Sequence, residues 1–267
     1  MTESNASSRA KPVRLPTSFK EKIWGSPRLS PWYPDSALKI GEVWFEADLP
    51  LLVKFIFTTE KLSVQVHPDD EFAAAHENSR GKTEMWHILR ADPGAQIAIG
   101  LREPITPERL RQSSLSGEIE RMLNWVNVHP GETYFIPAGT VHAIGAGIAL
   151  CEVQQQSDVT YRLYDYGRDR ELHLEKSMQV SDLSAHDGKP SLLPVKSAYF
   201  ETDVLIASEA MQVPALDRFQ LLIILDGSGT IAGEPYKPGE AWHVGAGAGP
   251  VEIEPAGPSK FLRTWVP

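Results

Sequence analysis

Hydrophobic and polar residues alternate along most of the chain, in short runs that turn residues separate. The runs are rich in Val, Ile, Phe and Tyr, which is typical of strands with one buried face. The expected strands are 51–57, 62–66, 84–89, 95–100, 124–128, 132–136, 147–153, 159–164, 197–207, 219–225, 240–244, 251–255 and 261–266. Short strands at such regular intervals favour a sandwich or barrel over βαβ units.

Three segments have a helical pattern instead of an alternating one. They are residues 69–78, 106–125 and 172–180. Asp69 or Asp70 can be the N-cap of the first helix. Thr106 can cap the second, with Pro107 at its first helical position and Ser116 as the start of a further turn. The chain is therefore predicted to be mainly β, with few helices.

One sequence pattern occurs twice. Residues 131–142, "GETYFIPAGTVH", fit G-x5-P-x-G-x2-H, the second sequence motif of the cupin barrel, and residues 239–250, "GEAWHVGAGAGP", align with them without a gap. In the motif, Pro fixes φ and Gly permits positive φ, so that the next strand presents its His inward. Gly245 replaces the Pro and Pro250 replaces the His. The pattern predicts two cupin-like β-barrels (jelly rolls), of which the second binds no metal.

The pattern also predicts how the chain divides. Residues 1–15 are polar and are expected to be a flexible lead. Residues 16–180 are predicted to form a catalytic cupin domain with a small helical insertion near 104–124. Residues 181–194, rich in Ser, Asp, Gly and Pro, are the expected linker. Residues 195–267 are predicted to be a degenerate C-terminal cupin domain without metal.

Composition excludes some classes of partner. The 267 residues carry a net charge of -9, which argues against nucleic acid or an anionic membrane surface as a partner but is compatible with a small anionic substrate. Cys151 is the only cysteine, so no intrachain disulfide can form. Neither a secretory signal nor an apolar run of membrane-spanning length is found. We expect a cytoplasmic protein, either a monomer or a weak homodimer.

Four polar side chains stand where strands meet the barrel interior. Gln65 and His67 share one face of a strand, because side chains alternate with period two. Glu84 opens the next strand, and His142 closes the first copy of the cupin motif. A lone His in an apolar strand is usually a core residue, but His67 and His142 each belong to an independent spacing pattern. Two imidazoles, a carboxylate and an amide oxygen suit zinc, while Mn, Fe, Co and Ni are chemically possible.

Longer segments resemble a known enzyme family. "LSVQVHPDD…GKTEMWHIL" and "PAGTVHAIGAGI…EVQQQSDVTYRLYDYGR", with "FKEKIWG" and "IGEVWF" upstream, are similar to the short bacterial form of type I phosphomannose isomerase. The resemblance covers residues 15–180 strongly and the remainder only through the second cupin pattern. It implies two cupin domains and a zinc-dependent interconversion of mannose 6-phosphate and fructose 6-phosphate.

The resemblance also implies roles for individual residues. One zinc ion per chain would be held by Gln65, His67, Glu84 and His142. Residues expected to line the site are Lys54, Ser63, Lys82, Glu152 and Arg162. Of these, Glu152 matches the family's acid–base candidate and Arg162 its essential arginine, while Lys82 belongs to the same signature as Glu84.

Aldose–ketose isomerisation requires chemical groups of the kinds that these residues carry. Moving a proton between C1 and C2 through an enediol requires a base that reaches both carbons and a positive charge for the developing oxyanion. Glu152 could move the proton, zinc or Arg162 could stabilise the enediolate, and Lys54, Ser63, Lys82 or Arg162 could hold the phosphate. The sequence leaves this division of labour open.

Less specific interpretations remain at this point. Lys54 and Lys82 could be solvated surface residues, and Glu152 or Arg162 could belong to a buried structural ion pair. The partner of Arg162 would then be Asp158 or Asp165. The whole chain could also be a non-catalytic sugar-phosphate sensor or another metal-dependent cupin enzyme, such as an oxygenase.

Overall fold

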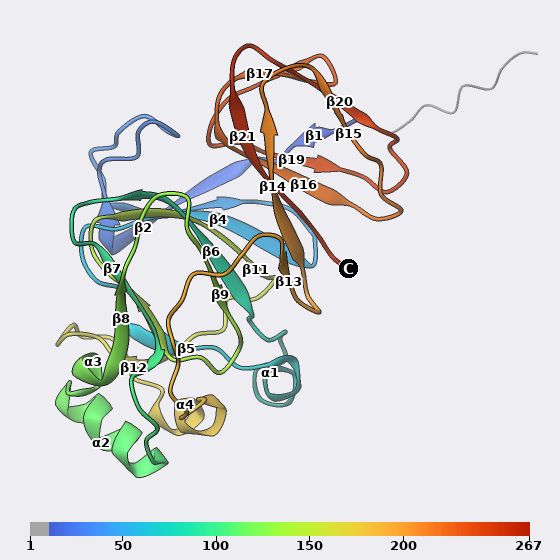
Figure 1. Cartoon of the computed structure of the whole chain (residues 1–267). Coiled ribbons are helices and arrows are strands. Elements are labelled where there is room, and N and C mark those ends of the chain that lie inside the picture. The colour runs from blue at the N-terminus through green and yellow to red at the C-terminus, as the bar shows by residue number, and fades with distance from the viewer. Residues whose placement is uncertain (1–10) are drawn as a thin grey trace, which may run out of the picture. The chain divides into compact units, whose positions relative to one another are not determined.

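The computed structural model describes residues 11–267, which form two compact units (Figure 1). The N-terminal unit consists of Thr17–Ser30 and Pro34–Leu192. The C-terminal unit consists of Leu193–Pro267 together with Pro31–Tyr33 and the described residues up to Pro16. Each unit contains two antiparallel sheets.

The N-terminal unit has a large sheet and a small sheet. In spatial order, the large sheet contains β2 (Thr17–Ser26), β3 (Ile40–Phe45), β4 (Leu51–Phe57), β11 (Ile148–Gln155), β6 (Glu84–Ala91) and β9 (Thr133–Ile136). The small sheet contains β12 (Tyr161–Tyr164), β5 (Val64–Val66), β10 (His142–Ile144), β7 (Gln96–Leu101) and β8 (Leu123–Asn127). One hydrophobic core includes Ile88 and Leu150 from the large sheet and Ile97 and Ile144 from the small sheet, so the two sheets pack face to face.

Four helices belong to this unit (Figure 1). They are α1 (Asp70–Glu77), α2 (Pro107–Ser116), α3 (Ile119–Met122) and α4 (Leu174–Val180). Leu110 of α2 and Ile119 of α3 are buried in a second core with residues of β5, β10 and β12, so these helices cover the outer side of the small sheet. α2 and α3 lie within residues 104–124, the segment where the helical insertion was predicted.

The first residues of α1 and α2 can be compared with the predicted N-caps. The Asp69 carboxylate accepts a hydrogen bond from the Phe72 amide, and the Thr106 hydroxyl accepts one from the Arg109 amide, which confirms both predicted N-caps. The second start at Ser116 is wrong. Ser116 is the last residue of α2, where Gly117 ends the helix in a left-handed conformation before α3 begins.

The C-terminal unit repeats the two-sheet arrangement. One sheet contains β1 (Val13–Arg14), β19 (Ala241–Val244), β16 (Gln220–Asp226), β21 (Ser259–Trp265), β14 (Glu201–Ala207) and β13 (Val195–Lys196). The other contains β15 (Met211–Val213), β20 (Val251–Pro255), β17 (Gly229–Ile231) and β18 (Glu234–Tyr236). A core with members from both sheets, among them Ile224, Phe261 and Ile253, fills the interior.

The repeated motif has the same backbone in both units. Each copy has a glycine with positive φ, a four-residue strand (β9 or β19), and a second glycine with positive φ eight residues after the first. The φ values are 93° and 86° at Gly131 and Gly139, and 85° and 69° at Gly239 and Gly247. The turn therefore survives in the second copy although the histidine does not.

The mainly β fold with few helices is confirmed, and some strand predictions were incomplete. β2 was not expected as a strand because it lies at the edge of the large sheet and most of its residues are exposed or half-buried, which weakens the apolar pattern. The predicted flexible lead falls largely on residues 1–10, outside the described part. Its residues Val13–Arg14 differ from that prediction, because they pair with β19.

The two units divide at Leu192–Leu193, near the end of the predicted linker 181–194. Most of that segment lies against the N-terminal unit. The Asp182 amide donates to the Gly139 carbonyl, and the Ser191 amide donates to the Thr133 carbonyl. These hydrogen bonds satisfy backbone groups that a free linker would leave to water.

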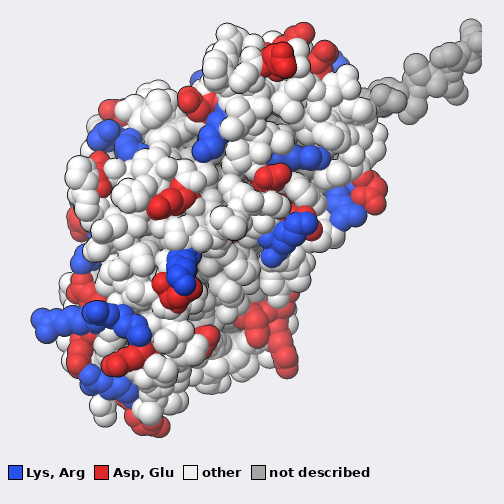
Figure 2. All heavy atoms as spheres, in the orientation of Figure 1, with Lys and Arg blue, Asp and Glu red and all other residues white. Residues whose placement is uncertain are grey.

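Charges of both signs are interspersed over the face that Figure 2 shows, with no extended field of one sign. Surface ion pairs in the described chain include Lys61 with Glu120 and Lys39 with Glu60. Among the helices of residues 11–267, none is long and apolar enough to cross a membrane.

We expect Gly139→Ala to destabilise the protein more than Gly94→Ala does. Both glycines have positive φ, 86° at Gly139 and 79° at Gly94. A Cβ added at Gly139 would lie 2.9 Å from the Val180 carbonyl oxygen, whereas a Cβ added at Gly94 would have no other atom within 4 Å. Positive φ costs alanine about 1 kcal/mol at either site, and the close approach adds to it only at Gly139. Equal melting temperatures for the two variants would contradict this account.

Candidate active site

A row of four side chains crosses the inner face of the large sheet. Strand register places Trp44 opposite Lys54, Lys54 opposite Glu152, and Glu152 opposite Trp86 on β3, β4, β11 and β6. Directly opposed residues share a face, so all four point into the unit. The Lys54 ammonium lies 4.7 Å from the centre of the Trp44 ring and 3.3 Å from Glu152 Oε1. The Trp86 indole N–H donates to Glu152 Oε2 at 3.1 Å.

The small sheet presents a second row. His142 of β10 lies opposite Gln65 of β5, which lies opposite Arg162 of β12. The Gln65 amide nitrogen is 3.3 Å from His142 Nε2. The Ser63 hydroxyl, two residues earlier, is 3.4 Å from the Gln65 amide oxygen. The sequence period of two therefore put these side chains on the correct face.

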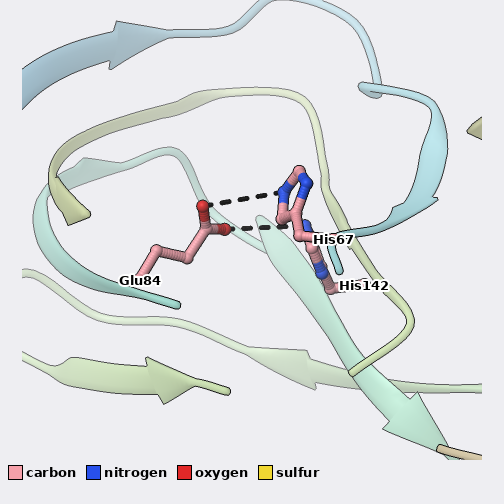
Figure 3. A group of neighbouring side chains, drawn as sticks. All are labelled: His67, Glu84 and His142. Atoms are coloured by element: carbon pink, nitrogen blue, oxygen red, sulfur yellow. Dashed lines mark ion pairs between the residues drawn. The ribbon is translucent and has the colours of Figure 1, made fainter. Parts of the chain in front are cut away.

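Glu84 joins the two sheets by reaching from β6 toward two imidazoles (Figure 3). Its carboxylate oxygens lie 3.5 Å from His142 Nε2 and 3.7 Å from His67 Nε2. One ligand atom from each of the three residues lies within 4.8 Å of the others, and all three side chains are buried. The group can hold a metal ion.

Backbone carbonyls set the protonation of both imidazoles. His67 Nδ1 lies 2.8 Å from the Val159 carbonyl oxygen, and His142 Nδ1 lies 2.8 Å from the Thr140 carbonyl oxygen. A carbonyl only accepts, so Nδ1 carries the hydrogen in each ring. Burial lowers the pKa of His142 to about 4 and that of His67 well below its ordinary value, so both rings are neutral near pH 7. Each Nε2 therefore directs a lone pair at Glu84, as in metal-binding histidines.

Buried polar atoms of His67 and Glu84 that have no hydrogen-bond partner also indicate that this cluster suits a metal ion. His67 Nε2 and both carboxylate oxygens of Glu84 are buried and accept no hydrogen bond. Lys82 Nζ, 2.9 Å from Glu84 Oε2, is the nearby cation. Burial and the neighbouring Glu152 carboxylate raise the pKa of Glu84. Buried lone pairs are costly without a partner, and a cation would supply one to all three atoms.

Two lysines hold Glu152 in its charged form. Its Oε1 lies 3.3 Å from Lys54 Nζ and 3.7 Å from Lys82 Nζ, and all three residues are at most 5% exposed. Burial opposes ionisation of Glu152, but Lys82 and Lys54 outweigh it and lower the pKa of the carboxyl group. Burial alone would lower the pKa of Lys82, yet Glu152 and Glu84 raise it. The interpretation of Lys54 and Lys82 as surface residues is therefore wrong.

Arg162 has neither of the acidic partners that a structural role would give it. In the described part of the chain no ion pair joins it to Asp158 or Asp165. One guanidinium nitrogen donates to the Glu171 carbonyl oxygen at 2.7 Å, and the buried Nε has no hydrogen-bond partner. Burial lowers the pKa of the guanidinium. A partly dry guanidinium with a free N–H can bind an anion.

A cavity of about 370 Å³ connects these groups. Six of the nine predicted site residues line it, namely Lys54, Ser63, Gln65, Lys82, Glu152 and Arg162. Of the other three, His142 contacts Gln65, Glu84 contacts Lys82, and His67 lies 3.7 Å from Glu84. The structure thus brings all nine predicted residues together.

Comparisons with known proteins identify the family. No protein-family model matches the chain. The chain is 33% identical to the mannose-6-phosphate isomerase ManA of Bacillus subtilis, over 91% of this chain and 96% of that protein. It is 42% identical to a mannose-6-phosphate isomerase of Streptococcus mutans over 60% of this chain and 52% of the relative. The crystal structure of the Bacillus subtilis mannose 6-phosphate isomerase superposes with a TM-score of 0.86, at 27% identity over 96% of this chain and all of that one.

The chain belongs to the mannose-6-phosphate isomerase family. This confirms the resemblance that the QVHPD and GKTE segments indicated. The lining of the cavity also contains residues that were not predicted from the sequence.

The missed residues lie on the rim of the cavity. Lys22, Glu42 and Trp44 come from β2 and β3, and Arg170 follows β12. Side chains alternate along the strand "IGEVWF", so Glu42 and Trp44 share one face. This alternation is the signal that could have predicted both residues at the site. Arg170 lies in a loop, where no period predicts the direction of a side chain.

We expect His142→Ala to lose its metal while His87→Ala keeps it. Removing one of the lone pairs that converge at the cluster should weaken metal binding by more than about 100-fold. His87 is a matched control, because it is equally buried in the same unit but directs Nδ1 to the Thr133 hydroxyl at 2.8 Å. Elemental analysis of both purified variants checks this. Full metal occupancy in His142→Ala would exclude it as a ligand.

Metal binding should also weaken in acid. In the metal-free protein, burial raises the pKa of Glu84 to about 7, so below that pH a metal must displace a proton from the carboxyl group. The imidazoles do not compete until about pH 4, where His142 becomes charged. Titration calorimetry of the metal-free protein in buffers of different ionisation enthalpy should find nearly one proton released per metal at pH 6 and almost none at pH 8. Equal proton release at both values would contradict the raised pKa.

Proposed function

We propose that this chain interconverts mannose 6-phosphate and fructose 6-phosphate, with a zinc ion held by Gln65, His67, Glu84 and His142. One observation carries the proposal. A carboxylate that lysines keep ionised, Glu152, lines the cavity, and Lys82 links it to the cluster of metal-binding lone pairs. The names of the relatives support mannose 6-phosphate as the substrate and isomerisation as the reaction.

The donor atoms suit zinc. Two neutral imidazoles, one carboxylate and one amide oxygen form the kind of mixed nitrogen and oxygen set that catalytic zinc sites use, and Mn, Fe, Co and Ni bind similar sets. When bound, the ion supplies positive charge beside the substrate oxygens that become negative during enolisation.

Glu152 is the proposed base. Its Oε1 is buried and accepts no hydrogen bond, whereas its Oε2 is held by the Trp86 indole. Oε1 can therefore take a proton from C2 of the aldose and return it to C1, and reverse this for the ketose. Because the carboxyl pKa is lowered, the base is ionised at neutral pH, and activity should fall as acid protonates it.

The basic residues have distinct proposed roles. Lys82 lies between the Glu84 and Glu152 carboxylates and stays charged, so it can offset the negative charge of the enediolate. Lys54 is held against Trp44 and, with Ser63, lines the cavity where the sugar chain would bind. Burial lowers the pKa of Lys54, although the neighbouring Glu152 carboxylate opposes this.

A coupled assay for fructose 6-phosphate formation from mannose 6-phosphate, run beside elemental analysis, tests the proposal. We expect turnover, about one metal per chain, and loss of turnover on chelation that zinc restores. A metal-containing protein that binds the sugar phosphate without turnover would be a sensor. Oxygen consumption with an iron-loaded protein would indicate an oxygenase.

Glu152→Gln should abolish most of the isomerase activity and leave the metal in place. The amide keeps the size of the side chain and can still accept from the Trp86 indole, but it cannot take a proton. We expect kcat to fall by about 10²–10⁴-fold, the usual contribution of a general base.

Glu42→Gln is the matched control for this prediction. Glu42 lines the same cavity and also accepts a hydrogen bond from an indole, that of Trp44 at 2.8 Å, yet it is not held between the two lysines. Its kcat should stay within about threefold of the wild type. Near-normal kcat in Glu152→Gln, with metal and melting temperature unchanged, would show that another group moves the proton.

A further inference from the structure

Two arginines line the cavity on the side of the small sheet. Arg162 lies on β12, and Arg170 follows in the loop after it. They are close enough for the charge of Arg170 to lower the pKa of Arg162. Two cations held near each other repel, so the fold must hold them together by other contacts.

A buried carboxylate holds Arg170 in place. Asp165 receives two hydrogen bonds from it, 2.5 Å from Nε to Oδ2 and 2.7 Å from Nη2 to Oδ1. The Asp165 side chain is 2% exposed, whereas that of Arg170 is 31% exposed. This two-point contact fixes the plane of the guanidinium and leaves Nη1 without a protein partner in the described residues.

Each of these two arginines has an N–H group that the protein leaves free. Nε of Arg162 and Nη1 of Arg170 have no hydrogen-bond partner in the described chain. Lys54 and Lys82, in contrast, are already within 3.7 Å of carboxylate oxygens of Glu152 or Glu84. An incoming anion would therefore find guanidinium N–H groups without a protein partner at the arginines, whereas the charge of each lysine is already paired with a carboxylate.

The charges around Arg162 and Arg170 also favour anion binding on this side of the cavity. Asp165 also pairs with Arg168 at 3.3 Å, so one carboxylate serves two guanidinium groups. Arg162 contacts only a neutral carbonyl through its Nη1. The acidic residue lining the cavity on this side is Asp158, which is exposed and forms no ion pair in the described chain. Arg168 also pairs with Glu60 at 3.8 Å, so the three arginines and the carboxylates of Asp165 and Glu60 leave about one positive charge, that of Arg162, for a phosphate to balance.

We propose that Arg170, oriented by Asp165, binds the substrate phosphate together with Arg162. This assignment rests on the proposed function for the identity of the substrate. It places the phosphate against the small sheet and leaves Lys54 and Lys82 to Glu152 and the reacting carbons. Arg170 is then a substrate-binding residue and Asp165 a positioning residue.

Kinetics and direct phosphate binding on the metal-loaded protein test the assignment. Arg170→Gln should raise the KM for mannose 6-phosphate and the dissociation constant for inorganic phosphate, measured by calorimetry, by about tenfold or more, the loss expected for one charge-assisted hydrogen bond. The kcat should stay within about threefold, because the phosphate does not react. Arg170→Lys should recover part of the phosphate affinity, since it restores the charge without the fork.

Arg168→Gln is the control for a structural role, because Arg168 pairs with the same carboxylate but does not line the cavity. It should leave phosphate affinity and KM within about twofold. Unchanged phosphate affinity in Arg170→Gln, or an equal loss in Arg168→Gln, would overturn the assignment. Calorimetry needs no turnover, so a wild-type protein that binds phosphate through Arg170 without isomerising the sugar would contradict only the proposed function.

Discussion

The structure depends on four charged side chains buried between two sheets. Lys54, Lys82, Glu84 and Glu152 are each at most 5% exposed, and an isolated charge in such a place costs several kcal/mol. They are tolerated because they alternate in sign, with each lysine within 3.7 Å of a carboxylate. Removing any one would leave an unbalanced charge in the interior. The mutual neutralisation of these four groups therefore constrains the register of β4, β6 and β11.

That constraint also creates the chemistry. Because the lysines lower the pKa of Glu152, a base stays ionised in a nearly dry cavity. Because Glu84 is shared between Lys82 and two neutral imidazoles, its lone pairs are available to a metal ion. The two sheets divide these tasks. The large sheet supplies Glu152, the proposed proton-transfer group, and the small sheet supplies the imidazole of His142 and Arg162, the arginine proposed to face the substrate.

The C-terminal unit has the same fold as the N-terminal unit but lacks the histidine of the cupin motif. It has the same sandwich of two sheets and the same glycine-bounded turn, with positive φ at Gly239 and Gly247. In place of the histidine it has Pro250, directly before β20. Backbone geometry in this fold is therefore preserved by glycine positions and apolar alternation alone, and the metal cluster is an addition to it.

The sequence by itself determined the mainly β fold, the helix caps at Asp69 and Thr106, and the face on which Gln65 and His67 lie. These features depend on neighbours along the chain, through period-two alternation and local capping. Strand order and the cupin motif indicated Glu84 and His142, and family resemblance added Lys54, Ser63, Lys82, Glu152 and Arg162. The fold brings these residues to one place.

Only the tertiary structure decided which side chains meet. Alternation gives the face of a strand but not the strand opposite, so the row from Trp44 through Lys54 to Glu152 could not be predicted from periodicity. The protonation of both imidazoles depends on carbonyls of Thr140 and Val159, one of them distant in sequence. Asp165, a candidate partner for Arg162 by sequence, instead holds Arg170, because the loop after β12 turns that side chain back toward it. Such pairings are set by the packing of non-adjacent segments, which local sequence patterns do not specify.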